Sequence, residues 1–172
     1  MVLTESYDTT EMTEFNALNA SLVDGDGHCV YFFPRYMLNM LMHDVQRPEL
    51  TQLYCVLSGE ALNPEHPAHQ FFAGRHMRNW EMIGSMNWIV PPSVNEEQFY
   101  NLYTLVTSAM DGIENRWLAD DSINPIEEWI NFSQIIFPEH EWTGFRDPTE
   151  REGDDSACLF NLTLSQRESM TN

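Results

Sequence analysis

Apolar side chains recur at spacings of three and four along the first two thirds of the chain, the pattern of helices with one buried face. One face of the segment before Asp111-Gly112 carries Phe99, Leu102, Tyr103 and Val106. Ser93, followed three residues later by Glu96, predicts the N-cap of this helix. The predicted helices cover residues 36–45, 49–57, 71–88 and 95–110.

After Gly112 the apolar runs become short and β-like, so we expect strands there. The predicted strands are residues 113–118, 129–137 and 142–145. Their aromatic side chains are assigned to the core at strand spacing, and they are Trp129, Phe132, Phe137, Trp142 and Phe145. The expected fold class is therefore α+β, with helices in the N-terminal two thirds and a small, mostly antiparallel sheet toward the C-terminus.

Length and composition suit a single compact domain over residues 1–172. Within it, residues 1–20 are expected to be a loose acidic lead-in and residues 147–157 an acidic loop. Hydrophobic residues make up 42% of the chain, too many for a disordered protein. No apolar run reaches the roughly 18 residues that cross a bilayer, and the start, MVLTESYDTTEMTEF, lacks the features of a secretory signal. We expect neither membrane association nor secretion.

The chain offers little sign of a metal or cofactor. Its three cysteines, Cys29, Cys55 and Cys158, are odd in number and form no CxxC pair, which favours a reducing, cytoplasmic compartment. Two histidines three residues apart can bind zinc, and His66 and His69, with His76 beyond, have that spacing. No Cys or carboxylate pair completes the set at a recognised spacing. We therefore interpret them as surface histidines and expect no metal and no cofactor.

The charge is unusual, because 27 Asp and Glu face eight arginines and no lysine, for a formal net charge of −19. Such a surface repels nucleic acid and attracts basic proteins. A lysine-free chain suits surroundings rich in ubiquitin-type conjugation, since it offers no side-chain amine. Adaptation to high salt would also deplete lysine, although the many large aromatics fit that poorly. The simplest interpretation is a solvated, repulsive surface; a phosphate-mimicking surface that occupies a nucleic-acid-binding protein is the more specific one.

The segment with the clearest chemical pattern is Asp24-Gly25-Asp26-Gly27-His28-Cys29-Val30-Tyr31. A cysteine between a glycine-rich turn and a buried helix gains from both, because the turn exposes N–H groups and the helix N-terminus stabilises a thiolate. A nucleophilic cysteine also needs a histidine base from elsewhere. The alternative is an ordinary acidic turn followed by a small buried cysteine.

The segment from Gly25 to Tyr31 resembles the catalytic-cysteine box of the OTU (ovarian tumour) family of deubiquitinating cysteine proteases. The resemblance covers residues 20–146 and implies that Cys29 is the nucleophile and that Asp26 shapes the oxyanion loop. It also implies a general base near the end of the domain, for which His140 is the candidate.

Two hypotheses about function therefore stand. In the first, the chain is an OTU-like cysteine hydrolase, active or degenerate, whose partner is a ubiquitin-like protein. In the second, it is a non-enzymatic acidic inhibitor or interaction protein of the nucleic-acid-mimic type, for which a viral origin is one option. Its partner would be a basic nucleic-acid-binding protein, and it would bind no nucleic acid directly.

Overall fold

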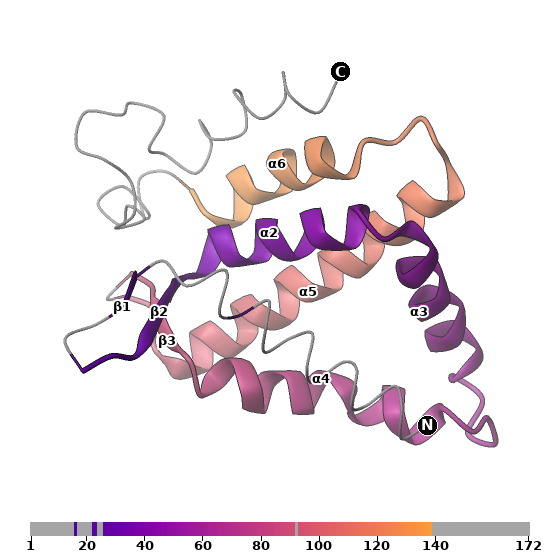
Figure 1. The fold of residues 1–172 in the computed structure, drawn as a ribbon, viewed down its shortest axis with the longest axis horizontal. Coiled ribbons are helices and arrows are strands. Elements are labelled where there is room, and N and C mark those ends of the chain that lie inside the picture. Colours follow the sequence, from indigo (N-terminus) through magenta and orange to yellow (C-terminus); the bar gives the residue numbers. More distant parts are fainter. Residues whose placement is uncertain (1–15, 17–21, 24–25, 92, 139–172) are drawn as a thin grey trace.

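The computed structural model of the chain describes residues 16, 22–23, 26–91 and 93–138. Five helices dominate this part of the chain (Figure 1). They are α2 (Phe33–Val45), α3 (Pro48–Glu60), α4 (His69–Gly84), α5 (Glu96–Ala119) and α6 (Pro125–Ile136). The described strands are short, and they are β1 (Leu22–Val23), β2 (Cys29–Phe32) and β3 (Asn87–Ile89).

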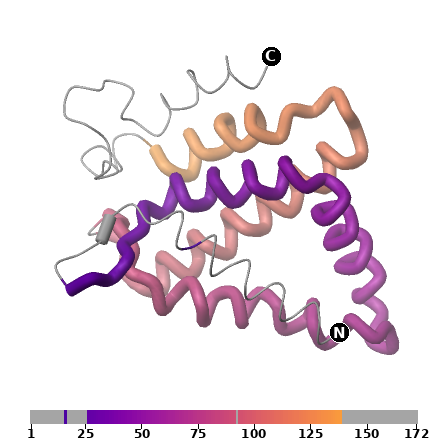
Figure 2. Tube along the Cα trace, in the orientation of Figure 1, coloured from indigo at the N-terminus to yellow at the C-terminus, as the bar shows by residue number. Residues whose placement is uncertain are grey.

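The helices pack around the long helix α5. Helix α6 lies against both α5 and α2, and α3 crosses the end of α2 and also contacts α5. The tube in Figure 2 shows that the small sheet and α3 lie at opposite ends of α2. In the described part of the chain, the sheet therefore lies at one end of α2, and α2, α3 and α5 meet at the other end.

The sheet is mixed, with β2 in the middle. Strand β1 pairs antiparallel with β2, opposing Val23 to Cys29, and β3 pairs parallel with β2, opposing Trp88 to Tyr31. The α+β class holds only loosely, because helices predominate, and the expected antiparallel sheet toward the C-terminus is wrong. The sheet of the described residues forms where the chain enters α2 and where it leaves α4.

The predicted strands at residues 113–118 and 129–137 are also wrong, since they belong to helices α5 and α6. The apolar spacing of α5 continues past Gly112 to Ile113, and burial of that face outweighs the usual preference of glycine for turns. The segments at 142–145 and 147–157 lie outside the described residues, as does nearly all of the lead-in at 1–20.

Local capping explains where the helices begin. Helix α5 starts two residues later than Ser93 implies, because Asn95 is its N-cap. The Asn95 side chain accepts from the Gln98 backbone N–H at 2.9 Å, and the Gln98 side chain accepts from the Asn95 N–H at 2.9 Å. Pro34 lies in the first turn of α2, where its missing N–H costs no helical hydrogen bond. The helices predicted at 36–45 and 49–57 are confirmed with small shifts in their bounds. The helix predicted at 71–88 is confirmed only as far as Gly84, and its last residues are wrong because residues 87–88 pair with β2 as part of strand β3.

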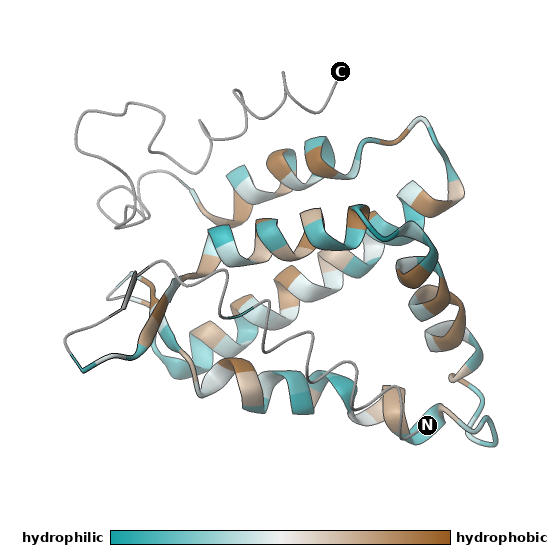
Figure 3. Cartoon of the chain, viewed as in Figure 1, coloured by the Kyte–Doolittle hydropathy of each residue, from teal (hydrophilic) through white to brown (hydrophobic). Residues whose placement is uncertain are grey.

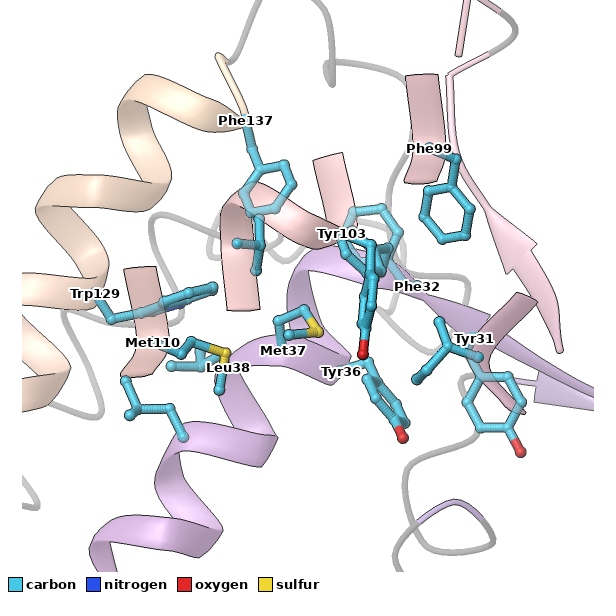
Figure 4. Packing of buried hydrophobic residues seen from close by; sticks show 14 of the residues in the cluster. Tyr31, Phe32, Tyr36, Met37, Leu38, Phe99, Tyr103, Met110, Trp129 and Phe137 are labelled. Carbon is cyan, nitrogen blue, oxygen red and sulfur yellow. The ribbon is translucent and has the colours of Figure 1, made fainter. Parts of the chain in front are cut away.

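A single aromatic-rich core joins the sheet to the helices (Figure 4). Phe33 is fully buried and makes edge-on ring contacts with Trp88 at 5.4 Å, Phe99 at 5.0 Å and Phe137 at 6.0 Å between centroids. Trp129 and Phe137 are core residues as predicted, although on a helix and at its end rather than on a strand. Trp142 and Phe145 lie outside the described residues.

Substitution of Gly112 tests whether helix α5 continues through this position instead of ending in a turn. A Cβ added at this position meets no atom within 4 Å, so Gly112→Ala should stabilise the helix, raising the free energy of unfolding by about 0.5–1 kcal/mol. Urea denaturation measures this. Gly27→Ala is the matched control: Gly27 has a φ of 86°, so that variant should be destabilised. A loss of stability in Gly112→Ala would contradict the helical assignment.

Candidate functional site

Cys29 is the first residue of β2 and is half-buried. Asp26 and His28 precede it in the chain and are exposed, with Gly27 between them in the left-handed region. The Asn87 side chain of β3 donates to the Cys29 carbonyl oxygen at 3.5 Å, so the backbone of this residue is held within the sheet. The glycine turn before the cysteine is therefore present, as the sequence predicts.

The helix that follows the cysteine is less close than expected. Helix α2 begins at Phe33, four residues after Cys29, so the thiol lies on a strand instead of at a helix N-terminus. Because the stabilising effect of a helix dipole fades within its first turn, α2 gives Cys29 little of the expected thiolate stabilisation. The sequence Cys-Val-Tyr-Phe favours a strand, since it is rich in β-branched and aromatic residues.

The neighbour of the Cys29 side chain is Tyr31, two residues on and therefore on the same face of the strand. Burial raises the pKa of the Tyr31 phenol, and the charge of Cys29 and a hydrogen bond with its thiol raise it further. His140, the predicted base, lies outside the described residues. The structure thus places two of the three predicted catalytic residues, and the assignment of all three stays a prediction.

The histidines with zinc-like spacing are each engaged by nearby groups. His69 Nδ1 lies 2.7 Å from the Ala61 carbonyl oxygen, and His66 Nδ1 accepts from the Ala68 N–H at 3.2 Å. His76 Nε2 lies 3.1 Å from the Thr104 hydroxyl, and its ring stacks on Tyr103 of α5. Among the described residues, no group of three His, Cys, Asp or Glu side chains is arranged to hold a metal ion.

A site that the sequence analysis missed lies where α2, α3 and α5 meet. We call it the acidic junction, and define it as the carboxylic acids Asp44, Asp111 and Glu114 with the neighbouring Arg75 and Cys55. Glu114 of α5 is only 9% exposed, and its side chain is hydrogen-bonded to that of Asp44 near the end of α2. Two carboxyl groups can share a hydrogen bond only if one of them carries a proton.

Electrostatics identify Glu114 as the group that keeps the proton. Burial is the largest cause of its raised pKa, and the charge of Asp44, the hydrogen bond with Asp44 and the charge of Asp111 act in the same direction. Arg75 of α4 opposes them, and the resulting pKa of Glu114 is about 9. Partial burial of the Asp111 carboxyl raises its pKa as well. Because the residue as a whole is exposed, water screens its charge. The thiol of Cys55 on α3 has its pKa raised too, by burial first and then by Glu114 and Asp111.

The helical pattern contains a signal for this site. The buried face of α5 continues through Met110 and Ile113, and Glu114 occupies that same face, four residues after Met110. A carboxylate within an apolar stripe indicates a buried acid with a specific partner. The prediction of a turn at Gly112 concealed the stripe, since it placed Glu114 on a separate strand.

Comparison of the chain with protein-family models, with characterised proteins and with solved structures finds no match. None of the helices in the described part of the chain is long and apolar enough to cross a membrane.

The cysteine prediction is tested by chemistry at Cys29. If Cys29 is the nucleophile of an OTU-like hydrolase, a ubiquitin molecule with an electrophilic C-terminus should label the chain, and Cys29→Ala should abolish labelling. Intact mass spectrometry reads the adduct. Cys55→Ala is the matched control and should label normally. No adduct on the wild-type chain, or equal labelling of Cys29→Ala, would contradict the prediction.

The raised pKa of Glu114 predicts how stability depends on pH. A carboxyl whose pKa is higher in the folded state contributes most stability below its ordinary value of 4.5 and loses that contribution as pH rises toward about 9. Over this range Glu114 lowers the free energy of unfolding by at most about 1.4 kcal/mol per pH unit. Glu114→Gln removes the titration, so the difference in stability between variant and wild type should grow in favour of the variant as pH rises.

Urea denaturation at pH 5, 6, 7 and 8 measures that difference. Glu97→Gln makes the same substitution at an exposed position of α5 and should show no comparable slope. A constant difference between Glu114→Gln and wild type over these pH values would mean that Glu114 ionises normally in the folded protein.

Proposed function

We propose that the chain is a non-enzymatic acidic interaction protein that binds a basic surface of another protein. The observation that carries this proposal is the imbalance of exposed charge in the described part of the chain. Many acidic side chains there are exposed, on several helices and loops. They are Asp26, Glu49, Glu60, Glu65, Glu81, Glu96, Glu97, Asp111, Asp120, Asp121 and Glu127.

The arginines do not balance these carboxylates, because the described part of the chain has five arginines against eleven exposed acidic residues. The fold also engages these arginines. Arg116 pairs with Glu128 at 2.6 Å, joining α5 to α6, and Arg78 donates to the Phe71 carbonyl oxygen and stacks over the Phe71 ring. The Arg75 guanidinium lies over the Tyr54 ring at 5.1 Å beside the acidic junction. Arg35 and Arg47, both half-buried, have interaction partners as well. The net field around this part of the molecule is therefore strongly negative.

A negative field of this kind speeds the association with basic proteins and disfavours direct contact with nucleic acid. A protein surface that binds DNA or RNA presents clustered arginines and lysines, which makes it the chemical complement of this chain. Carboxylates spread over several elements can replace phosphates along such a surface. The class of partner that fits is thus a basic nucleic-acid-binding protein, which the chain would occupy as a competitor of nucleic acid.

Competition measures this proposal directly. Fluorescent DNA bound to each member of a panel of basic DNA-binding proteins should be displaced by the chain. The inferred affinity should fall steeply with salt, by at least about tenfold between 50 and 200 mM for even a few charge contacts. Absence of displacement across the panel, or an affinity that does not change with salt, would refute the proposal.

Two variants that each remove one negative charge separate surface charge from net charge. Glu96→Gln removes an exposed carboxylate from the first turn of α5. Asp44→Asn with Glu114→Gln removes the charge of Asp44 and the protonated carboxyl of Glu114 from the acidic junction. The surface variant should weaken displacement and reduce the salt dependence more than the junction variant does. Equal effects of the two variants would mean that the exposed charge on α5 does not contact the partner.

A further inference from the structure

Helix α3 packs against the rest of the molecule through one face only. On that inner face, the Thr51 hydroxyl donates to the Asp44 carbonyl oxygen at the end of α2, at 2.9 Å. One turn on, the Tyr54 ring meets the Phe72 ring of α4, with 6.3 Å between their centroids. Figure 3 shows hydrophobic residues along α3, and the inner face accounts for only some of them. The opposite face of α3 is therefore the one to consider as a binding surface.

The outer face of α3 combines two apolar residues with two acids. Glu49, Leu53, Val56 and Glu60 follow one another at spacings of four, three and four, so they form one stripe about half a turn around the helix from Thr51. Leu53 is 50% exposed and Val56 is 51% exposed, and both acids are exposed as well. We call these four residues the outer stripe. It has an apolar centre and a carboxylate at each end.

This arrangement is typical of a protein-binding helix, because interfaces have an apolar centre and a polar rim. Apolar side chains one turn apart, such as Leu53 and Val56, are the anchors with which a helix binds an apolar groove. The two acids are separated by roughly 16 Å along the helix axis. Glu60 is 58% exposed, although its carboxylate lies 3.5 Å from His66 Nε2. A complementary surface therefore has an apolar groove with a basic side chain near each end.

Charge decides between the possible occupants of the outer stripe. Helix α3 contains no lysine or arginine, so two copies of it would bring acid against acid. Antiparallel packing would place Glu49 near the second copy's Glu60, and parallel packing would place Glu49 near the second copy's Glu49. The parts of the chain at residues 1–15 and 139–172 also have more acids than arginines. A basic partner is the occupant that supplies a cation for both carboxylates.

We propose that the outer stripe is the docking element for the basic nucleic-acid-binding protein. Leu53 and Val56 enter an apolar groove of that protein, and Glu49 and Glu60 pair with arginine or lysine side chains at its two ends. This inference rests on the proposed function and adds the face and the chemistry of binding. The exposed acids of the other helices extend the attraction beyond α3, while the apolar contact contributes affinity that depends little on salt.

Neutral substitutions in the DNA-displacement assay test the apolar centre. Leu53→Gln with Val56→Gln keeps the net charge, and glutamine is a good helix former, so α3 should remain folded. The affinity should fall by at least about tenfold, because two apolar anchors are lost, and its dependence on salt should stay the same. Met77→Gln with Leu105→Gln is the matched control on α4 and α5, since these side chains are 50% and 51% exposed. The control should displace DNA as the wild-type chain does.

The outcomes of this assay separate the two proposals. If the wild-type chain displaces DNA and the α3 variant does so equally well, the docking element is refuted and the proposed function stands. Equal losses in the α3 variant and in the Met77 and Leu105 control would also refute it, because the effect would not be specific to α3. If the wild-type chain displaces DNA from no member of the panel, both proposals fail.

A photoreactive residue identifies the occupant directly. With p-benzoylphenylalanine in place of Leu53, irradiation of the full chain with a basic protein that it displaces from DNA should cross-link the two proteins. The same residue in place of Leu105 should give no such product. Mass spectrometry locates the cross-link. A cross-link from position 53 to a second copy of the chain, or to another segment of the same chain, instead of to the basic protein would overturn the proposal.

Discussion

The rest of the structure depends on the packing of Phe33 against three other aromatic rings. Phe33 stands where strand β2 becomes helix α2, and its ring meets Trp88 after α4, Phe99 on α5 and Phe137 after α6. One buried side chain thereby joins strand β3 of the sheet to α5 and to the end of α6. Trp88 is fixed in addition by its indole N–H, which donates to the Ile83 carbonyl oxygen at 2.7 Å. The short strands, too small to be stable alone, are held by this packing.

A second constraint is the distribution of charge. With eight arginines against 27 acids, the chain must keep most carboxylates in water, and the fold does so by directing them outward along its helices. Among the acidic residues that the structure describes, Glu114 is the buried one, and it remains neutral by holding its proton. Arg116 pairs with Glu128 and so links α5 to α6 at the surface.

The helices of the first two thirds could be predicted because their apolar residues follow the helical period closely, as Phe99, Tyr103 and Val106 show. The second half of α5 could not, because Asp111-Gly112 has the local preference of a turn and only long-range packing overrides it. The acidic turn and Cys29 were found from their residues, but the strand between Cys29 and α2 depends on pairing with β3, 58 residues later in the chain. The acidic junction joins Asp44 to Glu114 across 70 residues, a contact that no local pattern specifies.

Helix α5 connects the two ends of the molecule. Its 24 residues span about 36 Å, and about 22 Å of that length separates Phe99 beneath the sheet from Glu114 at the junction with α2 and α3. An α-helix resists compression and bending over this length far better than a loop does. Because α5 carries Phe99 of the aromatic core and Glu114 of the acidic junction on one continuous helix, the two regions are held at a fixed separation and orientation.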